Sequence, residues 1–249
     1  MKIAQSTKSQ PKSSLVKSEN SLVTSRYRCD KCRDLTFIIN DNEAIPCECR
    51  AVREAENILK KSGISEEFRK KTFENFNYSF DIQTVDAFGK ASRYVSSFNE
   101  IRKTKNNSIM FMGQVGSGKT HLSMAVANRL MDNGISVIYM PFRDVITSIK
   151  QNMLDDAYYQ RAMNRYKKAT VLLIDDLFKG NITKSDINIM FEIINHRYFN
   201  SLSVIVSCEH TFESLLDIDE AVGSRLIEMS KNYLVEIKGR KLNYRIYGG

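Results

Sequence analysis

The sequence predicts a three-layer α/β fold, in which helices cover both faces of a parallel sheet, preceded by a small metal-binding domain. Three observations lead to this prediction. A glycine-rich loop lies between an apolar segment and a helical segment, a second apolar segment ends in two aspartates, and two close pairs of cysteines lie near the N-terminus. Strands that alternate with helices favour a parallel sheet, because parallel strands need crossover connections.

The composition sets the size and class of the protein. The chain has 249 residues, of which 42% are hydrophobic and 27% are charged, which suits one mid-sized core with a smaller appendage. It has no run of about 18 apolar residues, so we expect no membrane segment and a cytoplasmic location. The net charge of +8 is compatible with nucleic-acid binding, but a basic surface without a partner has the same charge.

Changes in composition divide the chain into four parts. Residues 1–25 are rich in Ser and Lys and are expected to form a flexible tail. Residues 26–62 carry the paired cysteines, and residues 63–80 form a linker. The three aromatic residues within 72–78 are expected to pack onto the next domain rather than to stack on bases. Residues 81–249 form the nucleotide-binding domain.

The cysteine pairs follow the pattern C-x2-C-x14-C-x-C, which predicts a structural zinc site. The four ligands would be Cys29, Cys32, Cys47 and Cys49. The residues between the pairs predict strand, turn and strand, as in a zinc ribbon. Because a domain of this size buries little apolar surface, the metal would supply its folding energy. Unligated thiols are the alternative, because the second pair is closer than the usual C-x2-C.

The phosphate-binding loop spans residues 113–120 and matches G-x-x-x-x-G-K-[ST] in full. Its glycines let backbone N–H groups converge on phosphates, and the following helix adds positive potential at its N-terminus. We expect Lys119 to contact the β- and γ-phosphates of ATP and the Thr120 hydroxyl to bind Mg²⁺. The predicted nucleotide-binding residues of this loop are Gly113, Val115, Gly116, Ser117, Gly118, Lys119 and Thr120.

A second apolar segment, residues 170–174, ends in Asp175 and Asp176. A carboxylate at the end of a buried strand beside a phosphate loop can complete a Mg²⁺ shell. We assign that role, and with it part of the nucleotide site, to Asp175. Asp176 would orient or deprotonate the attacking water. Farther along, residues 202–207 and 233–237 are expected to form buried strands.

These motifs together resemble those of AAA+ ATPases, and in particular of the bacterial and phage DnaC/DnaI-type replicative helicase loaders, to which the IstB transposition ATPases are related. Further cues are the segment 63–69, the Phe73/Phe76 pair, the Asp175-Asp176-Leu177 ending and Gly223-Ser224-Arg225. The resemblance covers residue 29 to the C-terminus. It implies a P-loop AAA+ core with a parallel sheet, in which Lys119 and Thr120 form Walker A and Asp175 and Asp176 form Walker B.

The resemblance also assigns two arginines. Arg225 corresponds to the arginine finger, which would reach the γ-phosphate of a neighbouring subunit and act in catalysis with Lys119 and Asp176. Arg245 corresponds to the sensor 2 arginine, a nucleotide contact. The sensor 1 position departs from the family pattern, because many members have Asn where this chain has Ser207 or Glu209.

The function implied by the resemblance is ATP-dependent loading of a DnaB-type hexameric helicase onto single-stranded DNA during DNA replication. It implies ATP, Mg²⁺ and Zn²⁺ as cofactors, self-association through the ATP sites, and no membrane partner. An IstB-like transposition ATPase that acts on duplex DNA is one alternative. A non-hydrolysing ATP-switch adaptor is another, because Asp176 stands where Glu is more common.

Overall fold

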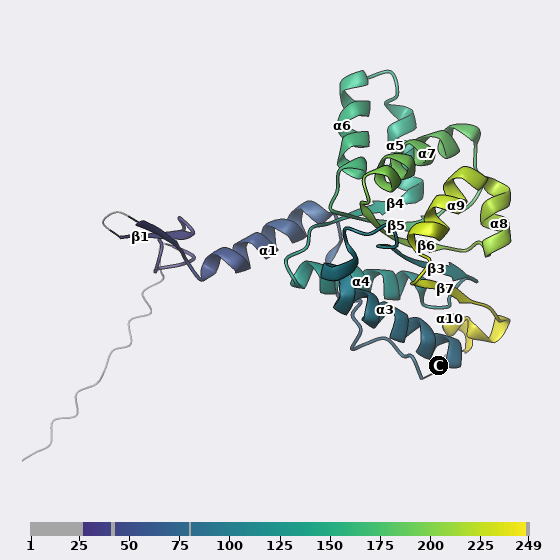
Figure 1. Cartoon of the computed structure of the whole chain (residues 1–249), viewed down its shortest axis with the longest axis horizontal. Coiled ribbons are helices and arrows are strands. Elements are labelled where there is room, and N and C mark those ends of the chain that lie inside the picture. Colours follow the sequence, from purple (N-terminus) through teal and green to yellow (C-terminus); the bar gives the residue numbers. More distant parts are fainter. Residues whose placement is uncertain (1–26, 41–42, 80, 248–249) are drawn as a thin grey trace, which may run out of the picture. The chain divides into compact units, whose positions relative to one another are not determined.

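A computed structural model describes residues 27–40, 43–79 and 81–247 (Figure 1). The tail expected at residues 1–25 lies outside the described residues. The chain divides into two compact units, Met1–Arg50 and Ala51–Gly249. Within the described ranges, no helix is both long enough and apolar enough to cross a membrane.

The first unit contains the cysteine pairs and an antiparallel hairpin. Strand β1 (Phe37–Asn40) pairs with β2 (Glu43–Pro46), so the two expected strands of the insert are present. The turn expected between them lies outside the described residues. Ahead of β1, the Asp34 carboxylate accepts a hydrogen bond of 3.0 Å from the backbone N–H of Cys29, which fixes the turn that carries the first pair. Helix α1 (Cys49–Ser62) begins at the fourth cysteine and continues into the second unit.

The second unit alternates helices with strands, as the sequence predicts. Its strands are β3 (Ile109–Gly113), β4 (Val137–Pro141), β5 (Val171–Leu177), β6 (Ser203–Cys208) and β7 (Leu234–Ile237). Its other helices are α2 (Glu66–Arg69), α3 (Ile82–Ile101), α4 (Lys119–Asp132), α5 (Phe142–Gln151), α6 (Asp156–Lys167), α7 (Lys184–Phe199), α8 (Phe212–Ile218), α9 (Glu220–Met229), the 3₁₀ turn η1 (Arg240–Leu242) and α10 (Tyr244–Tyr247).

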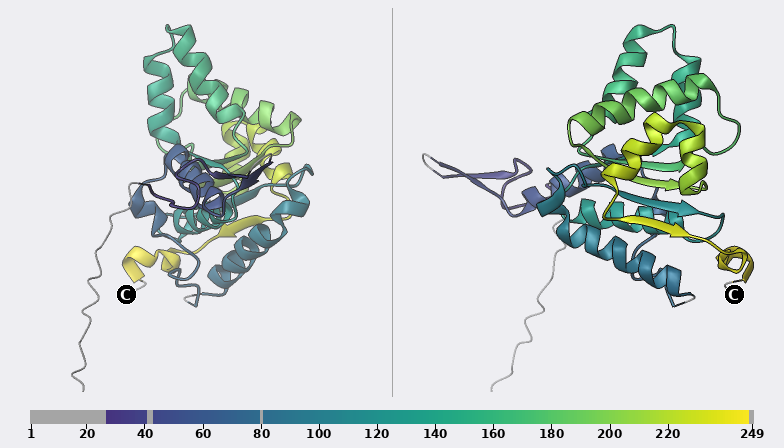
Figure 2. Two further views of the ribbon diagram at one scale, coloured as in Figure 1. Left: turned by 90° about the vertical axis from the view of Figure 1, so that its left-hand side faces the viewer. Right: turned by 45° about the vertical axis from the view of Figure 1, so that its right-hand side comes forward.

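The five strands of this unit form one parallel sheet in the order β4-β5-β6-β3-β7 (Figure 2). Strand β6 therefore lies between β3, which precedes the phosphate loop, and β5, which ends in the two aspartates. In open parallel sheets, ligands bind outside the carboxyl ends of the strands. The topology thus brings the loops after β3, β5 and β6 to one edge of the sheet.

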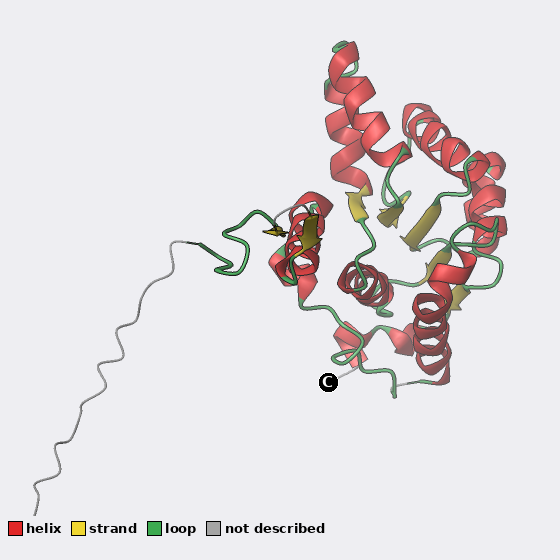
Figure 3. Ribbon diagram, turned by 60° about the vertical axis from the view of Figure 1, so that its left-hand side comes forward, coloured by secondary structure: helices red, strands yellow, loops and turns green. Residues whose placement is uncertain are grey.

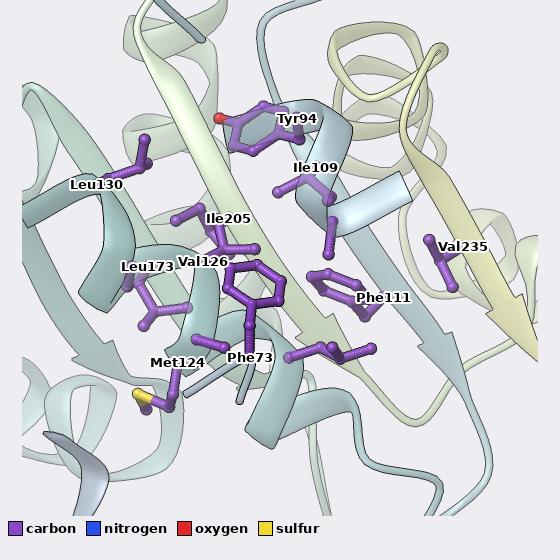
Figure 4. Packing of buried hydrophobic residues seen from close by; sticks show 14 of the residues in the cluster. Phe73, Tyr94, Ile109, Phe111, Met124, Val126, Leu130, Leu173, Ile205 and Val235 are labelled. Carbon is purple, nitrogen blue, oxygen red and sulfur yellow. The ribbon is translucent and has the colours of Figure 1, made fainter. Parts of the chain in front are cut away.

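Helices cover both faces of the sheet, which confirms the three-layer prediction (Figure 3). Helices α3 and α4 contribute to one buried apolar cluster, and helices α5 to α9 contribute to a second cluster on the other face. Figure 4 shows the first cluster, in which Phe111 of β3 and Ile205 of β6 meet Val126 of α4. Tyr94 of α3 is fully buried there and donates a hydrogen bond of 2.9 Å to the Asn107 carbonyl.

The described part of the expected linker, residues 63–79, packs against this first cluster through its aromatic residues, as expected. Phe73 and Phe76 are each 9% exposed and belong to the core. Asn128 of α4 donates hydrogen bonds to the carbonyls of Phe68, at 3.1 Å, and Lys71, at 2.9 Å. These contacts place the segment beside the phosphate loop.

Candidate nucleotide site and metal centre

At two positions of the phosphate loop, the backbone conformation and a close neighbouring group together allow only glycine. Gly113 has φ 117°, and a Cβ there would lie 2.0 Å from the Ile237 carbonyl oxygen of β7. Gly118 has φ 88°, and a Cβ there would lie 2.7 Å from the Phe76 ring. A side chain at either position would clash and would also be strained in its backbone. The glycines therefore allow β7 and the Phe76 ring to pack directly on the loop.

Lys119 opens helix α4 and is 5% exposed. Its ammonium donates a hydrogen bond of 2.5 Å to the Gln114 carbonyl. Burial lowers the pKa of Lys119, and the carboxylate of Glu209 opposes this shift. A cation buried at the N-terminus of a helix is suited to bind phosphate oxygens, because the phosphate replaces lost water contacts.

Asp175 lies at a break in the sheet at the end of β5, where the register with β6 shifts between Ile174 and Leu177. Its Oδ1 accepts hydrogen bonds from the hydroxyls of Thr120, at 3.1 Å, and Ser207, at 2.5 Å. Burial raises the pKa of Asp175, whereas these hydrogen bonds counteract the shift. The structure thus joins the predicted Mg²⁺ ligands Thr120 and Asp175 across 55 residues of sequence.

Asp176 has φ 55°, in the left-handed region. Its backbone N–H donates a hydrogen bond of 2.9 Å to Ser207 Oγ, so one serine fixes both aspartates. Ser207 is fully buried, whereas Glu209 lines the cavity. Non-glycine residues with positive φ are uncommon and concentrate at functional sites. The bulge therefore directs Asp175 and Asp176 into the same cavity from adjacent positions of one strand.

The cavity at this edge of the sheet has a volume of ≈ 450 Å³. It is lined by most of the predicted nucleotide-binding residues, namely Val115, Gly116, Ser117, Gly118, Lys119, Thr120, Asp175 and Arg245, and by Asp176. Gly113 is not among the lining residues; it lies against β7 instead. A volume of this size accommodates a small ligand.

The sequence reasoning missed several residues of this cavity. Lys179 lies 2.9 Å from both Asp176 Oδ2 and Glu209 Oε1, and its position three residues after Asp176 is a signal that could have identified it. Behind the cavity, Tyr139 in the middle of the neighbouring strand β4 donates to Asp175 Oδ2 at 3.3 Å. From the C-terminal segment, Tyr244 donates its backbone N–H to the Gly116 carbonyl at 2.9 Å.

The two predicted arginines differ in their positions. Arg245 of α10 lines the cavity, whereas Arg225 of α9 does not. The Arg225 guanidinium lies over the rings of Phe191, at 5.3 Å, and Tyr198, at 5.5 Å, both from α7. It also donates a hydrogen bond of 2.7 Å to the Ala221 carbonyl of its own helix. Arg225 is therefore placed apart from the phosphate loop of its own chain.

The cysteines of the first unit form a compact cluster. The predicted zinc ligands Cys29, Cys32, Cys47 and Cys49 have all four sulfur atoms within 4.8 Å of one another. The Sγ atoms of Cys29 and Cys47 are 3.8 Å apart, and those of Cys32 and Cys49 are 3.4 Å apart. Sulfurs at tetrahedral zinc–sulfur distances lie ~3.8 Å from one another. The donor set and its dimensions fit a zinc ion, so these cysteines can hold one.

Comparison with known proteins points to one family. The profile of the IstB-like ATP binding proteins matches residues 34–240. The phage-like element PBSX protein XkdC of Bacillus subtilis (strain 168) is 38% identical over 237 residues, which are 90% of this chain and 88% of XkdC. The replicative helicase loader DnaC of Escherichia coli (strain K12) is 26% identical over 155 residues, which are 62% of this chain and 61% of DnaC.

The fold is also that of a solved loader. The crystal structure of the DnaC helicase loader matches 70% of this chain and 100% of that chain, with a TM-score of 0.58 and 20% sequence identity. At this identity the likeness concerns the fold alone. The parallel sheet, the phosphate loop and the family match together show that this chain is a member of the IstB-like ATP binding protein family, with the AAA+ fold of the DnaC-type loaders.

Proposed function

We propose that this protein is an ATP-dependent loader that places a DnaB-type hexameric helicase on single-stranded DNA during replication, in the cytoplasm. The main support is that Lys119, Thr120, Asp175 and Asp176 line one cavity in a chain whose relatives include the helicase loader DnaC. The experiment that tests the proposal measures transfer of a cognate DnaB-type helicase to single-stranded DNA with and without this protein and ATP. No increase in bound helicase would contradict the proposed function.

The positions of the side chains support the proposed nucleotide roles. Lys119 would neutralise the β- and γ-phosphates, and Thr120 and Asp175 would hold Mg²⁺, which offsets the charge that develops on transfer. Asp176 would orient the attacking water. Lys119 acts on the bound ground state, whereas Asp176 acts mainly on the transition state.

This division of roles predicts different losses in two variants. Lys119→Ala should abolish tight ATP binding, and Asp176→Asn should keep ATP binding but lose turnover. Equilibrium nucleotide binding and steady-state hydrolysis, measured on the same preparations, distinguish the two effects. An equal loss of ATP affinity in both variants would show that the assignment is wrong.

The cysteine hairpin is the part that we expect to bind the helicase. Three of its apolar side chains, Leu35, Ile39 and Ile45, are 62%, 72% and 48% exposed, and exposed apolar side chains are available to contact a protein partner. Ile39→Asp should weaken capture of the helicase while ATP binding stays unchanged. Unchanged capture by this variant would assign the helicase contact to another surface.

Arg225 would act in a neighbouring subunit, which requires self-association through the ATP sites. An arginine supplied by a partner stabilises charge in the transition state by ~10³-fold or more. Arg225→Ala should therefore bind ATP but hydrolyse it poorly, and mixing it with Lys119→Ala should restore part of the turnover. If Arg225→Ala alone hydrolyses ATP at the wild-type rate, Arg225 has no role in catalysis. Its role would then be structural, through its contacts with the aromatic rings of α7.

Two other functions have specific support. The family is named for IstB-like ATP binding proteins, which favours a transposition ATPase that acts on duplex DNA. The Lys179–Asp176 ion pair of 2.9 Å engages the second acid and favours a non-hydrolysing adaptor. ATP turnover measured without DNA, with single-stranded DNA and with duplex DNA separates the three. Stimulation by duplex DNA alone would support the first alternative, and ATP binding without turnover would support the second.

A further inference from the structure

A lysine outside the phosphate-site motifs lies inside the nucleotide cavity. Lys179 belongs to the loop after β5, and its Nζ is 2.9 Å from Asp176 Oδ2 and 2.9 Å from Glu209 Oε1. It lines the same cavity as Lys119 and Thr120. One ammonium therefore bridges two carboxylates that come from the ends of different strands.

The backbone of this loop is fixed from several sides. Phe178 is fully buried and packs edge-on against Phe142, with 5.6 Å between ring centroids. The Phe178 carbonyl is 3.0 Å from Nε2 of His210, and the Lys179 carbonyl accepts a hydrogen bond of 3.1 Å from Arg143. Because the backbone is fixed on both sides of the peptide, rotation of the side chain alone moves the Lys179 ammonium within the cavity.

The charges in this part of the cavity require such a cation. Asp175, Asp176 and Glu209 contribute three carboxylates, and Lys119 lies among them with its ammonium on the Gln114 carbonyl. A terminal phosphate that enters beside Glu209 would be repelled by that carboxylate if it had no counterion. Lys179 supplies the counterion. An ammonium has three donors and can contact Glu209 and a phosphate oxygen at the same time.

We propose that Lys179 contacts the terminal phosphate of ATP, and that it exchanges its bond to Asp176 for that phosphate while it keeps its bond to Glu209. The inference rests on the proposed function, since it takes ATP as the ligand of this cavity. A nucleotide without the third phosphate offers Lys179 no such partner, so the Lys179–Asp176 ion pair persists with ADP. Asp176 is thus free to orient water only when a triphosphate is bound, and Lys179 lets the site distinguish ATP from ADP.

Equilibrium binding of a non-hydrolysable ATP analogue and of ADP, both with Mg²⁺, tests this inference on the full chain. In Lys179→Met, the Kd of the ATP analogue should rise about tenfold or more, whereas the Kd of ADP should stay within about twofold. Unchanged ADP binding also shows that the variant is folded. Lys179→Arg should retain most of the preference for the ATP analogue, because it keeps a cation at this position.

Two further variants sharpen the test. Lys238→Met removes a lysine that pairs with Glu236 at 3.0 Å outside the cavity, and it should change neither affinity. Asp176→Asn removes the carboxylate that competes for Lys179, so it should strengthen binding of the ATP analogue relative to ADP. Weaker binding of the analogue relative to ADP in Asp176→Asn would contradict the exchange.

The outcomes separate this inference from the proposed function. Equal weakening of both nucleotides by Lys179→Met would show a structural role, and no change in either would show that Lys179 does not contact the phosphate. Each result would overturn the inference while the ATP site stands. Failure of the wild-type protein to bind either nucleotide would overturn the proposed function and the inference together.

Discussion

The cysteine unit and the nucleotide-binding unit are stabilised in different ways. In the described part of the first unit, the only buried apolar residues are Cys32 and Cys47, whereas the second unit buries a large cluster on each face of its sheet. A fully buried aliphatic or aromatic side chain contributes ~1.5–3 kcal/mol. The second unit can therefore fold on apolar burial, but the first unit needs its ligand chemistry. One chain thus contains a unit that depends on metal binding and a unit that depends on side-chain packing.

Removing the metal should have the largest effect, and it should act on the first unit alone. We expect one zinc per chain, held by the four clustered cysteines, with ~10–16 kcal/mol of binding energy that supplies the folding of the hairpin. Metal analysis should show loss of zinc in Cys29→Ser, while the buried thiol variant Cys208→Ala keeps it. Cys208 is fully buried in the apolar core of the second unit and does not belong to the four-cysteine cluster.

Less than about half an equivalent of zinc in protein purified without chelator, unchanged by Cys29→Ser, would contradict this prediction. Unfolding of the second unit on chelation would break the comparison itself, because it would show that the nucleotide-binding unit also depends on the metal. Circular dichroism at 222 nm, together with nucleotide binding, reports on the second unit in the same samples.

The second-largest effect should come from a buried cation in the nucleotide-binding unit. Arg197 of α7 is fully buried and donates hydrogen bonds to four backbone carbonyls, which belong to Tyr166, Lys167, Ala169 and Ser203. These bonds join the end of α6 to the starts of β5 and β6. Arg197→Met would leave the carbonyls without this donor, at a cost on the order of 3–5 kcal/mol.

Urea unfolding measures this change in the free energy of unfolding. The exposed Arg161 of α6 offers a matched control, and Arg161→Met should change the free energy of unfolding by less than about 0.5 kcal/mol. Zinc content should be the same in both variants. A wild-type unfolding midpoint for Arg197→Met would mean that the buried guanidinium is not what joins these elements.

The smallest of these effects concerns an ion pair. Asp186 accepts hydrogen bonds from Lys150, at 2.8 Å, and from the backbone N–H of Thr183, at 2.9 Å. Burial acts to raise the pKa of Asp186, but these bonds outweigh it and hold the pKa below its ordinary value. The stabilisation is therefore present above the unfolded pKa of ~4 and is lost as the pH falls through the folded value.

Asp186→Asn should thus reduce stability by about 1 kcal/mol at pH 7. The difference from wild type should shrink as the pH falls below about 4. Urea unfolding at several pH values checks both statements. A loss as large as that of Arg197→Met would show that an ion pair with a partly exposed lysine contributes as much to the stability of this unit as a fully buried guanidinium.

Contiguous patterns made much of the molecule predictable from sequence. The phosphate loop was identified because its residues are consecutive, and its flanking strand and helix follow as β3 and α4. The cysteine spacing on a hairpin predicted the cluster that forms, and the three-layer parallel fold followed from the alternation of strands and helices. These features have short-range signals, because hydrophobic period, turn residues and ligand spacing act within a few residues.

Tertiary structure decided what those patterns do not contain. The sheet order puts Ser207 beside Asp175 and leaves Glu209 in the cavity, although the sequence offers both at the end of the same strand. It also pairs Lys179 with Glu209 and places Arg225 on the aromatic rings of α7. Each of these contacts joins residues from separate elements. No local propensity encodes them, because they depend on which strands are adjacent and on the direction in which a bulge turns a side chain.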